Sequence, residues 1–254
     1  MKITKTFSLF LVLNLMLLGL VSPATAERRQ RRTRTADFGL PTHRRDGGSR
    51  GFKDSCVANA ENQNLMALIP QKTVGVSASN SPKLFFYVPE LEDRSTLEFV
   101  LRNEEDDLMY EAFLATEGNG IMSVEVPSDV SSQMLEANQD YHWYLSMICD
   151  RQERSRDIVV EGWMRQETMD VATKEQLTNA SSIEKAEVYR EKGFWFDALS
   201  ALTEKSDSAA EKTIMRQKWS EMLASVGLAD LAAEPLVETE LIENSVDSSE
   251  NDSY

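Results

Sequence analysis

The clearest fold signal in this chain is Tyr141-His142-Trp143-Tyr144-Leu145-Ser146-Met147-Ile148-Cys149, whose side chains alternate with a period of two. Tyr141, Trp143, Leu145, Met147 and Cys149 share one face, and His142, Tyr144 and Ser146 begin the other. Such alternation is typical of a β-strand with one face on a core. The segment therefore predicts a long strand in an all-β region.

Similar segments occur on both sides of this strand. Leu97, Phe99 and Leu101 alternate with more polar neighbours, and turn formers such as Pro70, Pro89 and Gly118-Asn119-Gly120 separate the segments. About eight short strands at this spacing are typical of a sandwich or barrel. We expect a β-sandwich of the immunoglobulin or fibronectin-III type over residues 56–165, with a tyrosine corner near Leu135 and Tyr141. The remaining predicted strands lie at 65–69, 74–78, 84–88, 108–116, 122–126 and 158–164.

The hydrophobic period changes after Arg165. Ser181-x-x-Glu184 and Ser208-x-x-Glu211 are capping boxes, and Gly193 is placed to end the first helix. These signals predict a small α-helical hairpin domain over residues 168–233. The segment from Ala186 to Leu199 resembles one tetratricopeptide-like hairpin. Because solenoids need about three repeats, one hairpin cannot form a peptide-binding groove, and we expect instead a helical cap on the sandwich or on a dimer partner.

The N-terminus resembles a secretory signal peptide. Lys2 and Lys5 precede an uncharged run over residues 7–21, which ends at Pro23-Ala24-Thr25-Ala26. We therefore expect residues 1–26 to be a signal peptide that is cleaved after Ala26, and the mature protein to be periplasmic or secreted, with no transmembrane segment. The alternative is an uncleaved anchor.

Charge is distributed unevenly along the chain. Residues 28–53 contain nine basic and two acidic residues, whereas residues 234–254 contain seven acidic residues and no Lys or Arg. We expect a flexible basic arm at 27–55 and a disordered acidic tail at 234–254. The arm could instead contact an anionic surface, or the two tails could attract one another. A net charge of −15 argues against general nucleic-acid binding.

The chain has two cysteines, Cys56 and Cys149. In an oxidising compartment an even pair suggests a disulfide, which here would close a long loop. A metal site is the weaker interpretation, because neither His43 nor His142 has ligand spacing to a cysteine.

Sequence motifs of common enzymes were not found. The chain contains no G-x-S-x-G elbow, no phosphate-binding loop with its Lys and no H-E-x-x-H helix. We therefore nominate no catalytic, cofactor-binding or metal-ligating residue, and expect no cofactor. The leading hypothesis is an exported binding or scaffolding protein, whose partner is an envelope protein at the helical hairpin or an anionic surface at the basic arm. The alternative is a hydrolase, for example a carbohydrate-active one, with a carboxylate site that forms no motif.

Several segments together are similar to a family known as domain of unknown function 928, which consists of exported, mainly cyanobacterial proteins. The resemblance implies an exported protein and assigns no activity. It is carried by Asp46-Gly47-Gly48-Ser49-Arg50-Gly51, Cys56, Leu65-x-x-Leu68-Ile69-Pro70, Ser81-Pro82-x-x-Phe85-Phe86-Tyr87-Val88-Pro89, Tyr141-x-Trp143, Cys149-Asp150 and Gly193-Phe194-Trp195-Phe196-Asp197-Ala198-Leu199.

Overall fold

The structure is a computed structural model that describes residues 57, 64–71 and 73–242. The described residues belong to one compact unit. The predicted signal peptide, the basic arm and Cys56 lie outside the described residues, as does the end of the acidic tail.

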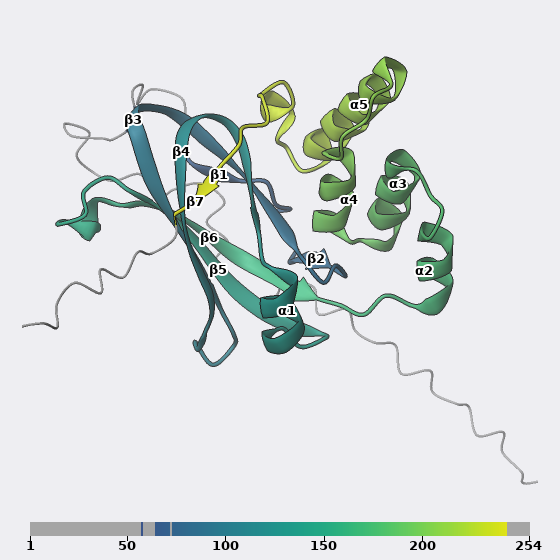
Figure 1. Cartoon of the computed structure of the whole chain (residues 1–254), viewed down its shortest axis with the longest axis horizontal. Coiled ribbons are helices and arrows are strands. Elements are labelled where there is room, and N and C mark those ends of the chain that lie inside the picture. Colours follow the sequence, from purple (N-terminus) through teal and green to yellow (C-terminus); the bar gives the residue numbers. More distant parts are fainter. Residues whose placement is uncertain (1–56, 58–63, 72, 243–254) are drawn as a thin grey trace, which may run out of the picture. The chain divides into compact units, whose positions relative to one another are not determined.

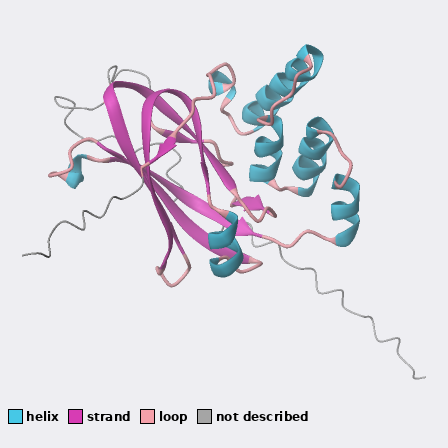
Figure 2. Cartoon of the chain, viewed as in Figure 1, coloured by secondary structure: helices cyan, strands magenta, loops and turns pink. Residues whose placement is uncertain are grey.

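The described chain contains short and long strands followed by a group of helices (Figures 1 and 2). The strands are β1 (Met66–Ala67), β2 (Gly75–Ser77), β3 (Lys83–Arg102), β4 (Leu108–Glu125), β5 (Gln139–Ile148), β6 (Ile158–Gln166) and β7 (Glu240–Leu241). The α-helices are α1 (Ser128–Met134), α2 (Val171–Leu177), α3 (Ser182–Lys192), α4 (Trp195–Leu202) and α5 (Ala209–Ser225), with 3₁₀ turns at Arg154–Arg156 and Ala229–Leu231.

The described strands form one mixed sheet of seven strands. Its order is β2-β6-β5-β3-β4-β7, and β1 pairs with β3 outside this path. Only the β2–β6 pair is parallel among the strands described. The predicted immunoglobulin-like or fibronectin-III-like sandwich is therefore wrong, because a curled half-barrel replaces its two separate sheets (Figure 1).

A bend in the β3–β4 hairpin explains the difference. Glu90 pairs with Gly118 and Ser95 with Thr116, so three extra residues of β3 bulge between the two pairs. Bulges bend a strand pair and increase its twist. Gly118 has φ +73°, and a Cβ there would lie 2.3 Å from the carbonyl oxygen of Pro89. The predicted turns at Pro89 and Gly118-Asn119-Gly120 thus lie inside two long strands.

The bent sheet encloses an apolar cluster, which we call the sheet core. Phe86, from the first half of β3, packs edge-to-face on Phe99 from the second half and on Trp143 of β5, with ring centroids 6.3 and 5.3 Å apart. All three side chains are fully buried. The sheet core therefore lies between the two halves of one bent hairpin, as the core of a sandwich lies between its two sheets.

A second apolar cluster, the helix-side core, joins the other face of β3 to the helices. Phe85 packs edge-to-face on Trp219 of α5, and Tyr87 belongs to the same cluster. The indole Nε1 of Trp195, at the start of α4, donates to the carbonyl oxygen of Leu68 at 2.8 Å. The helices thus pack directly on the sheet.

The helix signals at α3 are confirmed. Ser181 and Glu184 form a reciprocal capping box at the start of α3, and Gly193 ends that helix with φ 84°. The second predicted capping box forms only in part: Ser208 accepts from the Glu211 N–H, but the Glu211 carboxylate accepts from the hydroxyl of Ser206. Helix α1, however, lies where the sequence predicted a turn at Pro127-Ser128-Asp129.

One local expectation holds although the sandwich does not. The hydroxyl of Tyr141 accepts a hydrogen bond from the backbone N–H of Glu136 at 2.6 Å. This is the contact that a tyrosine corner makes to the backbone a few residues upstream. The contact therefore forms here in a different tertiary setting.

The first residues of the predicted acidic tail pair with β4. The N–H of Ile121 donates to the carbonyl oxygen of Pro235, and the N–H of Ile242 donates to that of Phe113. Residues 235–242 therefore run along the outer edge of β4 and include β7. Within the described part, none of the helices has the length and apolar character that a membrane span requires.

Candidate functional site

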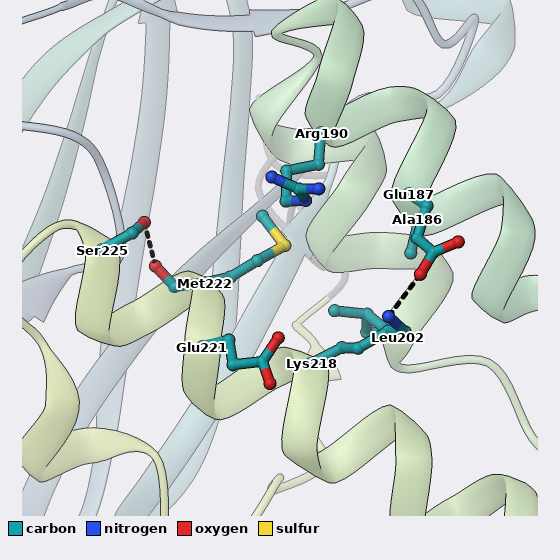
Figure 3. A pocket seen from close by; sticks show the side chains of 8 residues that line it. All are labelled: Ala186, Glu187, Arg190, Leu202, Lys218, Glu221, Met222 and Ser225. Carbon is teal, nitrogen blue, oxygen red and sulfur yellow. Dashed lines mark hydrogen bonds and ion pairs between the residues drawn. The ribbon is translucent and has the colours of Figure 1, made fainter.

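A groove with a volume of about 280 Å³ lies between α3 and α5 (Figure 3). One side comes from α3, the other from α5, and Leu202 at the end of α4 contributes to the lining. The other lining residues are Ala186, Glu187 and Arg190 from α3, and Lys218, Glu221, Met222 and Ser225 from α5.

Helical spacing brings these side chains together. Glu221, Met222 and Ser225 lie three, four and seven positions after Lys218, which places them along one side of α5. Ala186 and Arg190 are one turn apart on α3 in the same way. The groove therefore forms where two helix faces meet. Each face contains both small or apolar residues and charged ones.

The apolar part of the groove is its buried part. Ala186, Met222 and Leu202 are between 2 and 7% exposed, and all belong to the helix-side core. Arg190 of α3 and Met222 of α5 face one another across the groove (Figure 3). A ligand here would contact apolar atoms below and charged groups at the edges.

Most of the charged groups already have partners. Lys218 forms an ion pair with Glu187 across the groove, and Glu221 accepts a hydrogen bond from the Gln217 side-chain amide at 2.9 Å. Arg190 is different, because its guanidinium has no hydrogen bond or ion pair with any described residue. With respect to the described residues, the groove thus offers one unpaired cation above an apolar floor.

A larger cavity, of about 550 Å³, lies on another side of α5, against residues 232–236. Met215 and Trp219 supply its apolar lining, and Lys212 and Arg216 lie one turn apart beside them. Leu202 lines both cavities. Helix α5 is therefore flanked by two concave surfaces.

His142 lies on the sheet face opposite the sheet core. Its ring stacks on Trp163 at 4.5 Å, its Nδ1 lies 2.8 Å from the Tyr144 hydroxyl, and its Nε2 lies 3.0 Å from the Glu161 carboxylate without hydrogen-bond alignment. Burial lowers the pKa of His142 below 6.5, although Glu161 opposes the shift. We interpret the cluster as cross-strand packing. His43 lies outside the described residues.

The predicted disulfide falls only partly within the described chain. Cys149 directly follows β5, whose last residue, Ile148, pairs with Thr96 of β3. Val57, the neighbour of Cys56 in sequence, bridges Leu91 of the same strand. Both approach β3 near its bend, and the pairing of Cys56 with Cys149 stays a prediction.

One described carboxyl group has a raised pKa. Burial raises the pKa of Asp197, in the first turn of α4, from 3.8 to about 6, although hydrogen bonds from Ala78 and Ser77 oppose the shift. The pKa values of Asp170 and Glu184 are lowered by hydrogen bonds from Thr173 and Ser181. A pair of raised carboxyls, which would favour a hydrolase, is not found among the described side chains. The described residues also contain no cluster of His, Cys, Asp or Glu suited to a metal ion.

The comparison with family models identifies the family of this chain. A model described as Domain of Unknown Function (DUF928) matches residues 45–236. The chain belongs to this family. In this DUF928 member the matched region contains β1–β6, the five α-helices of the described residues, the groove between α3 and α5 and the larger cavity beside α5, and it ends before β7. The search of curated proteins found no match.

Sequence reasoning found the helices but not the groove. The relevant signal was present, since Lys218 and Met222 share a helix face with Glu221 and Ser225. That signal is weak, because mixed charged and apolar faces occur on most surface helices. The packing of α3 beside α5 is what makes this face concave.

Proposed function

We propose that this chain is an exported, non-enzymatic binding protein that holds an extended, acidic segment of a partner protein in the groove between α3 and α5. The observation that carries this proposal is Arg190, a cation without a described partner above the apolar floor formed by Ala186 and Met222. A carboxylate of the partner would supply the missing charge-assisted contact. Aliphatic groups beside it would cover the floor.

The dimensions of the groove favour an extended segment. The part of α5 that lines the groove runs from Lys218 to Ser225, which at 1.5 Å per residue is about 10 Å long. A strand rises about 3.3 Å per residue, so roughly three residues of an extended segment could lie along it. This is the size of a short peptide stretch rather than of a flat domain interface.

Export is supported by the sequence of residues 1–26, which resembles a signal peptide. A protein released outside the cytoplasm would meet envelope proteins as partners. The basic arm at 27–55 offers the competing mode, which is attachment to an anionic surface. Such attachment would weaken steeply with salt, because exposed charges are screened at high ionic strength.

The test uses a photo-crosslinking amino acid at Ser225, inside the groove, and at Val171, an exposed position on α2 that does not line it. Both proteins are exposed to the envelope fraction of the native cells at low and high salt. We expect a discrete crosslinked segment from position 225 only, at both salt concentrations. A synthetic copy of that segment should bind the purified protein.

The control variants separate the groove from general charge effects. Arg190→Glu should weaken binding of the synthetic peptide at least tenfold. Lys192→Glu, on the same helix but outside the groove, should leave that binding unchanged. Replacing the acidic side chain of the peptide with its amide should also weaken binding, but less than Arg190→Glu does, because the charge reversal adds repulsion. Equal effects of the two variants, or crosslinks that disappear at high salt, would contradict the proposal and favour the basic arm.

A further inference from the structure

A third cavity lies where the helical hairpin meets the sheet, and it differs from the grooves beside α5. Its volume is about 170 Å³, and its lining comes from the loop before β3 and the start of β3, from helix α3, and from helix α4 with the turn after it. The lining residues are Ser79, Ser81, Lys83, Lys185, Tyr189, Phe196, Asp197, Ser200, Ala201 and Glu204. Most of them are polar, so the cavity is suited to a hydrophilic ligand.

The acidic groups of this junction cavity are already occupied. Asp197 is buried, and its Oδ2 accepts a hydrogen bond from the backbone N–H of Ala78 at 3.0 Å. This bond links α4 to the loop before β3. Glu204 accepts from the hydroxyl of Ser182 at 2.5 Å. Lys83 forms an ion pair with Glu125 at 3.1 Å. These contacts satisfy the two acids and one of the two lysines.

Three donors on the helical side have no such partners. The ammonium of Lys185, the hydroxyl of Tyr189 and the hydroxyl of Ser200 make no hydrogen bond or ion pair with any described residue. Lys185 and Tyr189 are one turn apart on α3, and both are only partly exposed. Partly buried donors without acceptors favour an acceptor-rich ligand, because their desolvation is otherwise uncompensated.

The loop with Ser79 and Ser81, which we call the serine loop, adds one hydroxyl acceptor and one hydroxyl donor. Ser81 donates its hydroxyl hydrogen to the carbonyl oxygen of Val126 and so keeps its oxygen lone pairs. Ser79 accepts from the N–H of Ser81 and keeps a hydrogen to donate. A ligand that carries both hydroxyl groups and an anionic group would match both sides of the cavity.

We propose that this junction cavity binds a small hydroxylated carboxylate, with Lys185 and Tyr189 holding the carboxylate and the serine loop holding the hydroxyls. The cavity has room for about six water molecules at roughly 30 Å³ each, so a group of about the size of one sugar ring would fill it. The class therefore includes sugar acids. This site is separate from the peptide groove, so either proposal can fail alone.

The test is calorimetric titration of the purified protein with glucuronate, and in parallel with glucose and with inorganic phosphate. We expect saturable binding of glucuronate, and at least tenfold weaker binding of the two others. Lys185→Met should weaken glucuronate at least tenfold, and Tyr189→Phe by up to about tenfold, since a neutral hydrogen bond is weaker than a charged one. Lys174→Met, which removes an exposed lysine from α2, should bind as the unchanged protein does.

Several results would overturn the proposal. Absence of saturable glucuronate binding up to about 10 mM would contradict the proposed carboxylate site. Glucose binding of equal strength would show that the carboxylate is not recognised, and phosphate binding of equal strength would show that the hydroxyls are not. Unchanged binding by Lys185→Met, with a thermal midpoint equal to that of the unchanged protein, would place the ligand elsewhere.

Discussion

The two halves of β3 have different surroundings although they belong to one strand. In the first half, residues 84–88 are all buried, at most 2% exposed. In the second half, Leu97, Phe99 and Leu101 are buried, whereas Glu98 and Val100 between them are only partly covered. The first half lies between the sheet core and the helix-side core, and the second half has the sheet core on one face.

This difference explains two kinds of sequence pattern. A strand covered on both faces has no polar side, so Leu84-Phe85-Phe86-Tyr87-Val88 is continuously apolar. A strand covered on one face keeps the alternation seen at residues 97–102. The change from one pattern to the other occurs at the bulge between Glu90 and Ser95.

The largest expected effect comes from truncating one aromatic side chain in each of the two cores. Phe86→Ala should lower the free energy of unfolding by about 3–5 kcal/mol and increase amide hydrogen exchange throughout the sheet, because Phe86 joins both halves of β3 to Trp143. Phe85→Ala should increase exchange chiefly in α4 and α5, because its ring packs on Trp219. Exchange is measured by mass spectrometry after brief labelling.

A matched control for this comparison is Val100→Ala, on the partly covered face of the second half. It should lower the free energy of unfolding by about 1 kcal/mol or less. Identical exchange patterns for Phe85→Ala and Phe86→Ala would show that the two cores are one cooperative unit.

The second prediction concerns the bend itself. If Cys56 and Cys149 are paired, the disulfide ties the chain beside the bend of β3, and Cys149→Ser should lower the free energy of unfolding by about 2–4 kcal/mol. Urea unfolding measures this loss. Intact-mass measurement after thiol labelling should show two labels only when the protein is reduced first. Two labels without reduction would refute the pairing.

The third prediction uses the pH dependence of the junction between sheet and helices. The pKa of Asp197 is about 6 in the folded protein and near 3.9 in an unfolded chain. The folded state therefore holds more protons between about pH 4 and pH 6, and this group's contribution to stability falls as the pH rises through that window. The difference of about two pKa units corresponds to at most about 3 kcal/mol.

The measurement is urea unfolding of the unchanged protein and of Asp197→Asn at pH 4, 5, 6 and 7. The stability of the unchanged protein relative to the variant should decrease across the window and level off above it. A constant difference at all four values would mean that the Asp197 carboxyl has the same pKa in the folded and unfolded states.

The smallest expected effect concerns the helical side alone. Ser181→Ala removes the capping box of α3 and should lower the free energy of unfolding by about 1 kcal/mol. Ser208→Ala should act similarly on α5. Hydrogen exchange in the sheet should not change in either variant. Faster exchange in β3 would show that the helices stabilise the strand more strongly than the local caps suggest.

The sequence by itself determined the local structure of this protein. Ser181, Glu184 and Gly193 specify the ends of α3 through hydrogen bonds and backbone conformation within a few residues. The alternation at residues 141–149 specifies β5, and Tyr141 makes the hydrogen bond to the upstream backbone that a tyrosine corner predicts. Each of these features depends on neighbours in sequence, so it can be predicted without knowing the tertiary fold.

Only the tertiary structure decided how these elements meet. The bulge after Glu90 converts the expected breaks at Pro89 and Gly118 into a bend, and so one curled sheet forms where two sheets were expected. The groove at Arg190 and the junction cavity at Lys185 exist because α3 packs beside α5, α4 and the loop before β3. Contacts between distant segments leave little periodic trace in either segment, because each one depends on the shape of the other.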